Sequence, residues 1–536
     1  MHSVLIYGRA TDSTTRLQKA VNQALIWNFG GPGESFSLSD VVQLRSGMKL
    51  FGHGATLTMT AEDTEIFNVE GLSDIEITGF VFVGHGDDYS DSDSSRACAI
   101  FGGTSGTNIT VHNNKFTNFC YTAARFKAQS NVNFTKNRVY MPGSGVITAV
   151  TSGKLYGVLA DAGCAGVWIK DNHFYQGAQG VRVEQTSDCT IDNNRMYDIY
   201  GQHGVYAGSG LTNLTVTDNK IYSPALCGIK VQAADAAAVD NRNIVVTGNT
   251  VLDAGDQGIL LCNSASSSTY VNRGITVNGN TVRNSTGQNI YVSQSVNGTV
   301  VGNSCDTAGQ SGVAWSECDN ITFADNGVNG SAASGMRDIS PSSTRITLRA
   351  NKITDCATAD AGAGDDNGIR LEFGSHYTLD GNEMRDADAN MQYGIYIAAA
   401  MNDTLTLTDN KVFNATDASV RFSDTTTPLL ENRRNSWHGG TVASYGDPPP
   451  PSITAAATIT LLQGHDVFII TGNTGITSIT APGFSGRTVR LVFTGTPTVT
   501  DGSNLKLAGN FVATADDVLT LTCDGTNWYE VARSTN

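Results

Sequence analysis

A pattern of five residues recurs along most of this chain and constrains its fold more than any other feature. The pattern is a small residue, an apolar residue, any residue, an apolar residue and any residue, as in Gly180-Val-Arg-Val-Glu184 and Gly228-Ile-Lys-Val-Gln232. Eleven copies start 23 to 33 residues apart, at Gly157, Gly180, Gly204, Gly228, Gly258, Asn289, Gly312, Gly335, Gly368, Gly394 and Ser419. Apolar residues with a period of two predict a β-strand that buries its second and fourth side chains. One short strand cannot bury that face alone, so the repeats predict a stack of coils, a solenoid.

A second strand pattern follows these copies and ends at an asparagine, as in Leu214-Thr-Val-Thr-Asp-Asn219 and Ile244-Val-Val-Thr-Gly-Asn249. A third, shorter strand comes next, for example Lys220-Ile-Tyr222. We place these asparagines at one corner of each coil, because asparagine is the non-glycine residue that best tolerates the left-handed backbone conformation. Stacked amides can also bond one another. We therefore assign these asparagines a structural role and no catalytic role.

The two ends of the chain differ from the repeats. The sequence Asp12-Ser-Thr-Thr15 precedes apolar residues at helical spacing, which predict a helix that covers the exposed end of the first coil. Those apolar residues are Leu17, Ala20, Val21, Ala24 and Leu25. Asp447-Pro-Pro-Pro-Pro451 interrupts the pattern near the other end, and short strands between Gly-rich turns follow it. We predict an all-β chain with a cap that includes a helix (1–34), a parallel β-helix (35–446), a Pro-rich linker (447–451) and an antiparallel β-sandwich (452–536).

Composition excludes several kinds of function. The formal net charge is −16, whereas a nucleic-acid partner would require a basic surface. We expect no membrane span and no visible export signal, because no segment has 18 consecutive apolar residues and the first ten residues form no leader. The ten cysteines form no CxxC pair and no zinc-like cluster, so we expect reduced, buried cysteines and no cofactor. Asp87, Asp88, Asp91 and Asp93 could bind structural calcium, but without a complete loop motif we expect a solvated acidic loop.

The coil of three strands with its asparagine corner resembles the right-handed parallel β-helix of pectate lyases, polygalacturonases and phage tailspikes. The resemblance covers about residues 35–440. The ending Cys523-Asp-Gly-Thr-Asn-Trp-Tyr-Glu530, after Asp501-Gly-Ser-Asn-Leu505, resembles the terminal β-domain of many phage tail fibres and spikes. In that group the terminal domain commonly supports trimerisation or contacts carbohydrate. The resemblance implies a homotrimeric tailspike-like protein of the virion tail that binds and depolymerises a bacterial surface polysaccharide.

The third residue of each copy should belong to an exposed strip. In order, these residues are Leu159, Arg182, Tyr206, Lys230, Leu260, Tyr291, Ala314, Arg337, Arg370, Tyr396 and Arg421. Five of the eleven are basic and three are tyrosines, and neighbouring coils lie about 4.8 Å apart. Tyrosine rings stack on sugars and guanidinium groups pair with carboxylates, so the strip suits an acidic polysaccharide. We expect Arg182, Tyr206, Lys230 and Tyr291 to bind it; the alternatives are a subunit interface or a solvated face with local ion pairs.

The fifth residues of two consecutive copies are Asp161 and Glu184, which should therefore lie side by side. Two carboxylates about 5 Å apart suit a retaining glycosidase, and a wider separation suits an inverting one. Like charges that close also raise one pKa, as a general acid requires. Arg125 and Lys127 occupy the same two strip positions one coil earlier and are further candidates for substrate binding. The alternative is an ordinary ion network among these four residues.

A rival constellation contains His203, Tyr206, Lys230 and Arg182. Gly201-Gln-His-Gly-Val-Tyr-Ala-Gly-Ser209, followed by Gly228-Ile-Lys230, is similar to a polygalacturonase pattern. The resemblance implies that His203 assists the acidic residues and that Lys230 binds the substrate carboxylate, although the three aspartates of that family are not matched. A lyase or epimerase could instead use Lys or Arg to neutralise a uronate and His or Tyr to move the proton. We expect hydrolysis through Asp161 and Glu184; the alternatives are such proton abstraction, adhesion without catalysis, and a corner role for His203.

Overall fold

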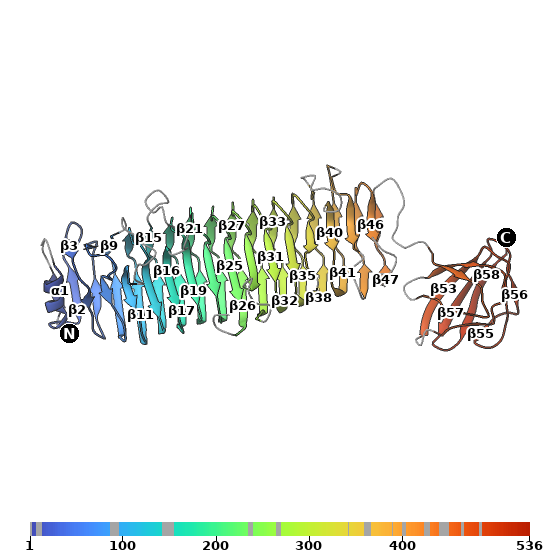
Figure 1. Ribbon diagram of the computed structural model, residues 1–536, viewed down its shortest axis with the longest axis horizontal. Helices are drawn as coiled ribbons and strands as arrows, with labels where there is room; N and C mark the ends of the chain where they lie inside the picture. The colour runs from blue at the N-terminus through green and yellow to red at the C-terminus, as the bar shows by residue number, and fades with distance from the viewer. Residues whose placement is uncertain are drawn as a thin grey trace.

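A computed structural model gives the fold of the protein (Figure 1). It describes residues 3–6, 13–85, 96–141, 155–233, 239–263, 270–340, 342–357, 366–388, 390–398, 404–422, 429–438, 450–462, 466–481 and 485–535. Within these ranges the chain forms 58 β-strands and one helix, α1 (Thr14–Val21), so the prediction of an all-β fold is confirmed.

Three long parallel sheets run along the β-helix, and each full coil contributes one strand to each sheet. We call them the opening, middle and closing sheets, after the order of the strands within a coil. The opening sheet contains β4 (Val42–Gln43), β7 (Phe67–Asn68), β10 (Cys98–Gly102), β13 (Thr122–Lys127), β16 (Tyr156–Asp161), β19 (Gln179–Glu184), β22 (Val205–Gly208), β25 (Ile229–Ala233), β28 (Ile259–Asn263), β31 (Ile290–Ser293), β34 (Val313–Ser316), β37 (Met336–Asp338), β40 (Asn367–Leu371), β43 (Tyr393–Ile397) and β46 (Ala418–Phe422).

The middle sheet contains β1 (Ser3–Ile6), β2 (Ile26–Phe29), β5 (Lys49–Phe51), β8 (Ser73–Thr78), β11 (Gly106–His112), β14 (Gln129–Thr135), β17 (Ala165–Lys170), β20 (Ser187–Asp192), β23 (Thr212–Thr217), β26 (Asn241–Thr247), β29 (Asn272–Asn278), β32 (Ser295–Val301), β35 (Asp319–Ala324), β38 (Thr344–Arg349), β41 (Ser375–Asp380), β44 (Leu405–Thr408) and β47 (Leu429–Arg433). The closing sheet contains β3 (Ser35–Leu38), β6 (Thr56–Met59), β9 (Val81–Val83), β12 (Lys115–Thr117), β15 (Arg138–Tyr140), β18 (His173–Tyr175), β21 (Arg195–Tyr197), β24 (Lys220–Tyr222), β27 (Thr250–Leu252), β30 (Thr281–Arg283), β33 (Ser304–Asp306), β36 (Gly327–Asn329), β39 (Lys352–Thr354), β42 (Glu383–Arg385), β45 (Lys411–Phe413) and β48 (Ser436–His438).

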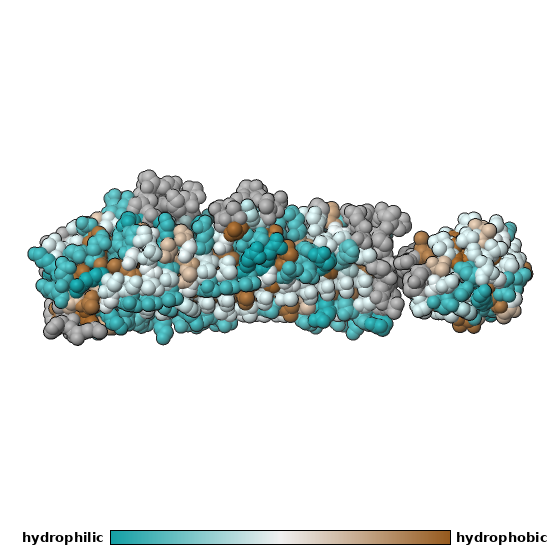
Figure 2. Space-filling model, turned by 90° about the horizontal axis from the view of Figure 1, so that it is seen from below, coloured by the Kyte–Doolittle hydropathy of each residue, from teal (hydrophilic) through white to brown (hydrophobic). Residues whose placement is uncertain are grey.

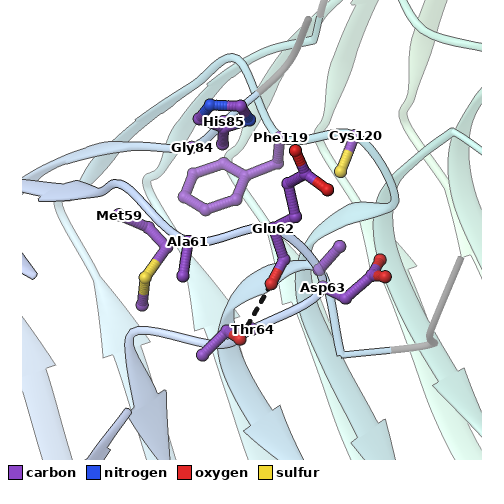
Figure 3. A pocket seen from close by; sticks show the side chains of 10 residues that line it. Met59, Ala61, Glu62, Asp63, Thr64, Gly84, His85, Phe119 and Cys120 are labelled. Carbon is purple, nitrogen blue, oxygen red and sulfur yellow. Dashed lines mark hydrogen bonds between the residues drawn. The ribbon is translucent and has the colours of Figure 1, made fainter. Parts of the chain in front are cut away.

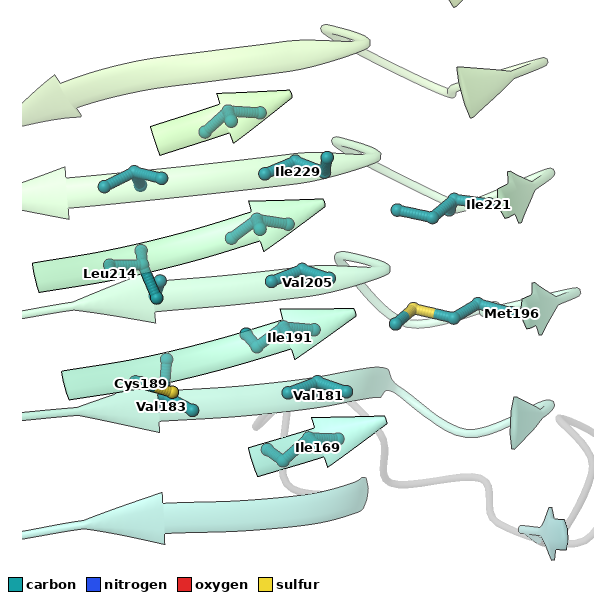
Figure 4. Packing of buried hydrophobic residues seen from close by; sticks show 14 of the residues in the cluster. Ile169, Val181, Val183, Cys189, Ile191, Met196, Val205, Leu214, Ile221 and Ile229 are labelled. Atoms are coloured by element: carbon teal, nitrogen blue, oxygen red, sulfur yellow. The ribbon is translucent and has the colours of Figure 1, made fainter. Parts of the chain in front are cut away.

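All eleven copies of the five-residue pattern lie at the opening sheet, in register from coil to coil. Val181 pairs with Val205, which pairs in turn with Ile229. These three side chains are fully buried, and Figure 4 shows them stacked in neighbouring coils. Met196 of β21 and Ile191 of β20 belong to the same core, which therefore receives side chains from all three sheets. The predicted solenoid and its buried positions are confirmed.

The first residue of the pattern is small because two neighbours leave no room for a side chain. A Cβ atom on Gly228 would collide with the Val251 side chain of the closing sheet. It would also lie only 2.7 Å from the carbonyl oxygen of Gly258 in the next coil. Gly204 and Gly258 meet the same kind of neighbours, a closing-sheet side chain and a carbonyl of the following coil. The glycines thus let the opening and closing sheets approach closely at this corner.

The predicted asparagine corner is present and forms a continuous ladder of side-chain amides. The Nδ2 group of each asparagine donates to the Oδ1 atom of the next, for example from Asn194 to Asn219 and from Asn219 to Asn249, both at 3.0 Å. The ladder runs through Asn114, Asn137, Asn172, Asn194, Asn219, Asn249, Asn280, Asn303, Asn326, Asn351, Asn382, Asn410 and Asn435. These residues satisfy buried polar groups, which is the structural role expected of them.

The expected backbone conformation at this corner belongs to a different residue. The ladder asparagines are not the residues with a positive φ; the residue before each of them is, as Asp171 (φ 59°), Asn193 (φ 50°) and Gly248 (φ 68°) illustrate. The turn therefore places its left-handed residue outside, where Gly, Asn and Asp fit. The following asparagine keeps an ordinary φ and directs its amide into the ladder.

Helix α1 covers the N-terminal end of the β-helix, as predicted. Leu17 and Val21 join the hydrophobic core, and the Gln18 side chain exchanges hydrogen bonds with the backbone of Gln43 in β4. The helix ends at Val21, so Ala24 and Leu25 lie beyond it. Strands β1 and β2 pair with each other and β2 pairs with β5, so the middle sheet already begins within the segment assigned to the cap.

The C-terminal segment has a hydrophobic core of its own and a mixed sheet. Strands β49 (Ser452–Thr454), β51 (Val467–Thr471) and β53 (Ser485–Phe493) are parallel neighbours. From β53 the order continues antiparallel through β57 (Val518–Asp524) and β58 (Trp528–Ser534). Shorter pairs complete this segment: β50 (Thr458–Ile459) with β52 (Ser478–Ile479), β54 (Thr498–Val499) with β56 (Phe511–Val512), and β55 (Leu505–Lys506) with β58.

The antiparallel order that we expected thus holds only for the pairs β53–β57 and β57–β58 of this sheet. Parallel neighbours need a crossover: β50 lies in the connection from β49 to β51 and β52 in that from β51 to β53, and the two pair with each other in a separate short sheet. The predicted linker at residues 447–451 lies mostly outside the described residues. The domain boundaries therefore stay a prediction.

The surface and the cysteines agree with the composition. Figure 2 shows a mainly polar or neutral face along the β-helix, with hydrophobic residues in small patches. All ten cysteines are free thiols, and all but Cys262 are buried. Among the described residues, no helix is long and apolar enough to cross a membrane.

Candidate functional site

The opening sheet brings most of the predicted site residues together on its outer face. One row runs in register through Arg125, Leu159, Arg182, Tyr206 and Lys230, on strands β13, β16, β19, β22 and β25. These side chains lie on the outer face because the alternate residues of the same strands fill the core.

A second row on the same strands carries the two carboxylates. Lys127 pairs with Asp161, and Glu184 lies in the same row on the next coil, opposite Gly208. Tyr291 is farther away, two coils beyond Lys230, with Leu260 between them. The structure thus brings eight of the nine predicted residues to five consecutive coils, where His203 occupies the corner before β22.

Asp161 forms an ion pair with Arg125. An Arg125 Nη2 hydrogen bond reaches Asp161 Oδ2 at 2.8 Å, and both side chains are only about one-seventh exposed (13% and 14%). The Arg125 guanidinium also lies 5.8 Å from the ring centre of Tyr121. Burial would lower the pKa of Arg125, but the neighbouring Asp161 outweighs it and raises that pKa. The other Asp161 oxygen, Oδ1, is buried and accepts no hydrogen bond from a described residue.

Arg182 is the centre of the cluster. Its Nη2 atom donates to Glu184 Oε1 at 2.8 Å, and its Nη1 atom donates to the hydroxyl of Tyr156 at 3.1 Å. The guanidinium lies between two rings, 5.0 Å from the centre of Tyr156 and 4.9 Å from that of Tyr206. These cation–π contacts and the two hydrogen bonds of the guanidinium, to Glu184 and to Tyr156, hold Arg182 in a fixed orientation.

Lys230 and His203 both lie against the Tyr206 ring. The Lys230 ammonium lies 5.9 Å from the centre of the Tyr206 ring, and the His203 ring stacks on the same ring at 5.8 Å. Burial, followed by the charges of Lys230 and Arg182, lowers the pKa of His203 to about 3. Its Nδ1 atom accepts the backbone N–H of Cys227 at 3.2 Å, so the neutral ring carries its proton on Nε2. Burial raises the pKa of Tyr206 to about 12.

The sequence patterns missed two residues of this cluster. Tyr121 and Tyr156 each stand before the five-residue window, one coil apart, and their rings meet edge to face at 5.4 Å. Burial raises the pKa of Tyr121 to about 12 and also raises that of Tyr156, so both are neutral donors at pH 7. An aromatic residue directly before the small residue, as in Tyr156-Gly157, was the available signal.

We call this group of residues the β13–β25 cluster. It consists of Tyr121, Arg125, Tyr156, Asp161, Arg182, Glu184, Tyr206 and Lys230. It combines two carboxylates, three fixed cations and three neutral tyrosines, so it can pair with anions, stack on flat apolar surfaces and transfer protons through carboxyl groups.

A third ion-paired carboxylate, Glu372, lies on the same face near the other end of the opening sheet. Glu372 Oε1 accepts hydrogen bonds from Arg337 Nε at 2.9 Å and forms an ion pair with Arg370 Nε at 2.6 Å. The Arg370 guanidinium lies 5.1 Å from the ring centre of Tyr396. This group resembles the β13–β25 cluster in composition but has one carboxylate, so it lacks a carboxyl pair.

The described residues show no metal-binding group of three or more His, Cys, Asp or Glu side chains. The four aspartates considered for calcium, Asp87, Asp88, Asp91 and Asp93, lie outside the described residues. A shallow pocket between the β6 and β9 coils contains no predicted site residue (Figure 3). It is lined by Met59, Ala61, Glu62, Asp63, Thr64, Gly84, His85, Ala97, Phe119 and Cys120.

Comparison with solved structures finds β-helix proteins at low identity. An exopolygalacturonase from Thermotoga maritima is 12% identical with a TM-score of 0.45, and the match covers 72% of this chain and 92% of that chain. The tailspike protein of E. coli bacteriophage HK620, solved with a pentasaccharide, is 16% identical with a TM-score of 0.49, covering 80% and 76%. A mannuronan C-5 epimerase A-module from Azotobacter vinelandii is 15% identical with a TM-score of 0.31, covering 81% and 96%. No curated protein sequence matches.

A family model gives the firmer assignment. The model described as a right-handed beta helix region matches residues 97–273, 156–326 and 288–441. These overlapping matches extend over residues 97–441, well over half of the 536 residues, and they include the whole β13–β25 cluster. The right-handed β-helix that the resemblance implied is therefore confirmed, and the chain belongs to the family of right-handed β-helix proteins.

Proposed function

We propose that this protein binds an acidic polysaccharide across the opening sheet and cleaves its glycosidic bonds there. The observation that carries the proposal is the β13–β25 cluster itself, in which two carboxylates are interleaved with arginines and tyrosines on five stacked coils. A row of coils about 4.8 Å apart offers contacts at regular intervals, which suits a linear polymer better than a compact ligand.

The charges favour an acidic polymer. The whole chain carries a formal net charge of −16, yet this cluster holds three fixed cations against two carboxylates, with Lys127 beside them. Arg182 and Lys230 lie over the Tyr206 ring from the two neighbouring coils, so a sugar ring against the free edge of Tyr206 would place its carboxylate within reach of either cation. Substrate binding by Arg182, Tyr206 and Lys230 follows from this arrangement.

Asp161 and Glu184 are the two carboxyl groups proposed for hydrolysis. One carboxyl donates a proton to the glycosidic oxygen while the bond from that oxygen to the sugar breaks. The other acts on water as a base or attacks the sugar as a nucleophile. Arg125 and Arg182 each hold one oxygen of these carboxylates, which fixes the two groups relative to the substrate. The β13–β25 cluster thus supplies acid, base and orientation from adjacent coils.

Proton abstraction, as in a lyase or epimerase, has less support. His203 is buried, its Nδ1 atom already accepts a backbone hydrogen bond, and its low pKa makes it a weak base. Tyr206 has a raised pKa and is therefore protonated at neutral pH. Hydrolysis through Asp161 and Glu184 requires neither His203 nor Tyr206 to accept a proton.

We also propose that the protein is tailspike-like: a homotrimer of the virion tail that acts on the surface polysaccharide of a host bacterium. The resemblance of the C-terminal sequence to terminal domains of tail fibres supports this proposal. The C-terminal segment also exposes large apolar side chains, among them Val512 (65% exposed) and Val531 (58% exposed), as a subunit interface would need. Sedimentation of the full chain should give the mass of three subunits; a monomer at micromolar concentration would contradict the trimer.

The test of cleavage compares three conservative variants on a panel of acidic bacterial polysaccharides. Asp161→Asn and Glu184→Gln should each lower the rate of cleavage at least about 100-fold, because each removes one group of the acid–base pair. Glu372→Gln changes the other ion-paired carboxylate of the same face and should leave the rate within about twofold of wild type. Size-exclusion chromatography measures the loss of polymer length.

The products separate the possible chemistries. Hydrolysis gives new reducing ends without ultraviolet absorbance, whereas elimination gives a conjugated, absorbing uronate. Full activity of Glu184→Gln would refute the proposed pair, and loss of activity in Glu372→Gln alone would move the site to the far end of the sheet. If the wild-type protein binds a polysaccharide tightly but does not shorten the polymer, the protein is an adhesin and not a depolymerase.

A further inference from the structure

The closing sheet carries a second organised surface that the candidate site does not use. Strands β15, β18, β21 and β24 each present a tyrosine outward at their last position: Tyr140, Tyr175, Tyr197 and Tyr222. Their rings form one continuous parallel stack, with centre-to-centre distances of 4.5, 5.2 and 5.0 Å and interplanar angles of 2°, 14° and 4°. Because the ring faces contact one another, the edges and hydroxyl groups form the accessible row.

A column of basic residues runs beside this tyrosine stack. It consists of Lys115, Arg138, His173, Arg195 and Lys220, which are in register on five consecutive coils. All but His173 are exposed. We call the five residues the basic column and the four tyrosines the tyrosine column.

The basic column is not neutralised by the described part of the chain. None of its arginines or lysines forms an ion pair with a described residue, and Lys115 instead lies over the Tyr140 ring at 5.3 Å. Acidic side chains at the preceding corner have other partners: Asp192 pairs with Lys170 at 2.8 Å, and Asp171 accepts a hydrogen bond from Asn193 at 2.7 Å. Like charges on adjacent strands destabilise a sheet, so the column costs stability unless something else compensates.

The same sheet shows how an ordinary solvated face is arranged. Farther along the closing sheet, the equivalent positions are Lys352, Glu383 and Lys411, where the sign of the charge alternates from coil to coil. Between the two regions the positions are uncharged, as at Thr250 and Thr281. The unbroken run of basic residues is therefore a local feature beside the tyrosine column, in a chain whose net charge is −16.

We propose that the basic column and the tyrosine column form a second binding surface for a linear acidic polysaccharide, which lies along the axis of the β-helix over β12 to β24. Guanidinium and ammonium groups of successive coils pair with carboxylates of the polymer, and the phenol hydroxyls bond its sugar hydroxyls. The tyrosine column keeps the row straight and rigid, which reduces the entropy lost on binding. His173 adds no positive charge to the basic column when its ring is neutral. Its Nδ1 atom lies 3.3 Å from the Tyr175 hydroxyl, within hydrogen-bonding distance.

The charge of the whole chain favours a polysaccharide over a nucleic acid. A nucleic acid carries one charge for about every 1.7 Å of duplex and would meet repulsion from the acidic remainder of the protein. A uronate polymer has a lower charge density and hydroxyl groups that match the tyrosines. The choice of an acidic polysaccharide rests on the proposed function. The second surface lies on the closing sheet, whereas the proposed cleavage site lies on the opening sheet.

The test measures binding of polygalacturonate to the full chain at low ionic strength, with dextran as an uncharged control polymer. The triple variant R138Q/R195Q/K220Q should weaken binding roughly tenfold, as the loss of three exposed ion pairs implies, and should flatten its dependence on salt. The matched control K352Q/K411Q removes two exposed lysines of the same sheet and should bind like wild type. Circular dichroism and the melting temperature check that each variant is folded.

The outcomes distinguish this proposal from the proposed function. The triple variant should still cleave short oligosaccharides of any substrate at the wild-type rate, whereas Glu184→Gln should bind polygalacturonate at the basic column as before. Wild-type affinity in the triple variant, or no binding of polygalacturonate by the wild-type protein, would overturn the second surface. Tighter binding of single-stranded DNA than of polygalacturonate at equal ionic strength would show that the surface selects nucleic acid and would overturn the assignment to polysaccharide.

Discussion

Removing one amide from the asparagine ladder should destabilise the β-helix by several kcal/mol. Asn219 is fully buried in the middle of the ladder. Its Oδ1 atom accepts the backbone N–H of Asn194 and the Asn194 Nδ2 group, both at 3.0 Å, and its Nδ2 atom donates to the carbonyl of Ile191 at 2.8 Å. The substitution Asn219→Ala removes these three hydrogen bonds and also those that Asn219 Nδ2 donates to Asn249 Oδ1 at 3.0 Å and to the Thr217 carbonyl at 2.9 Å. The neighbouring ladder residues Asn194 and Asn249 are also fully buried, so the corner is shielded from bulk solvent.

The size of the destabilisation follows from the buried groups that lose a hydrogen bond to Asn219. A buried group left without its hydrogen bond costs about 1–3 kcal/mol, and Asn194 Nδ2 keeps a second acceptor, the carbonyl of Ile169. We therefore expect the free energy of unfolding to fall by roughly 3–6 kcal/mol. Urea unfolding followed by circular dichroism measures this loss. Hydrogen exchange should show faster opening of β20, β23 and β26, the middle-sheet strands around the missing amide.

A surface amide of the same coil provides the control. Asn213 is exposed, has a φ of 56°, and donates to Asp188 Oδ1 at 2.7 Å. Asn213→Gly suits this backbone conformation and should change the free energy of unfolding by no more than about 0.5 kcal/mol. A loss below about 1 kcal/mol for Asn219→Ala would refute the idea that the ladder satisfies otherwise orphaned groups. Equal losses in the two variants would refute it as well.

Three further changes test other parts of the structure. Gly228→Ala places a methyl group against Val251 and the Gly258 carbonyl and should cost roughly 1–3 kcal/mol of unfolding free energy. The control Gly327→Ala changes an exposed residue of β36, where the nearest atom lies 4.0 Å from the added Cβ, and it should cost less; equal losses would refute the close approach. Burial raises the pKa of Asp338 to about 7 despite the hydrogen bond from Tyr377. The folded state therefore binds this proton more tightly than the unfolded state, and the free energy of unfolding should fall as the pH rises from about 4 to 7. Asp338→Asn should remove that fall in urea unfolding between pH 4 and 8, and an unchanged pH profile would contradict it. Arg182→Gln should weaken polysaccharide binding and cleavage together, because Arg182 holds both Glu184 and the tyrosines of the β13–β25 cluster. The melting temperature should change by no more than a few degrees. Unchanged binding would show that Arg182 is structural.

The fold could be predicted from the sequence because the buried positions repeat in a simple way. The period of two within each copy of the five-residue pattern predicted β-strands. The recurrence of the pattern, as in Gly228-Ile-Lys-Val-Gln232, predicted that these strands stack into a solenoid. The left-handed residue of the asparagine corner was assigned to the asparagine itself, although it is the residue before it, such as Asp171. The sequence shows that a corner needs such a residue but not which of two neighbours directs its side chain inward.

The candidate site was only partly predictable. The rows through Arg182 and Asp161 follow directly from the register, whereas Tyr121 and Tyr156 stand outside the repeating window and join the site through the shape of the corner. The tyrosine column was missed because each closing strand has only three residues, too few for a periodic signal within one coil. Asp338 was passed over, although it stands at the fourth position of the Gly335 copy, which is apolar in the other copies. Only the fold shows the hydrogen bond from Tyr377 that Asp338 accepts there.

The location of a bound oligosaccharide tests the central claim most directly. Crystals of Glu184→Gln soaked with an oligosaccharide of the cleaved polymer should show sugar density on the outer face of β16, β19, β22 and β25. A sugar ring should lie against the edge of Tyr206, and a substrate carboxylate should lie within hydrogen-bonding distance of Arg182 or Lys230. Density on the closing sheet in addition would agree with the second surface. Sugar bound only beside Glu372, or only to the C-terminal segment, would contradict the assignment of the active site to the β13–β25 cluster.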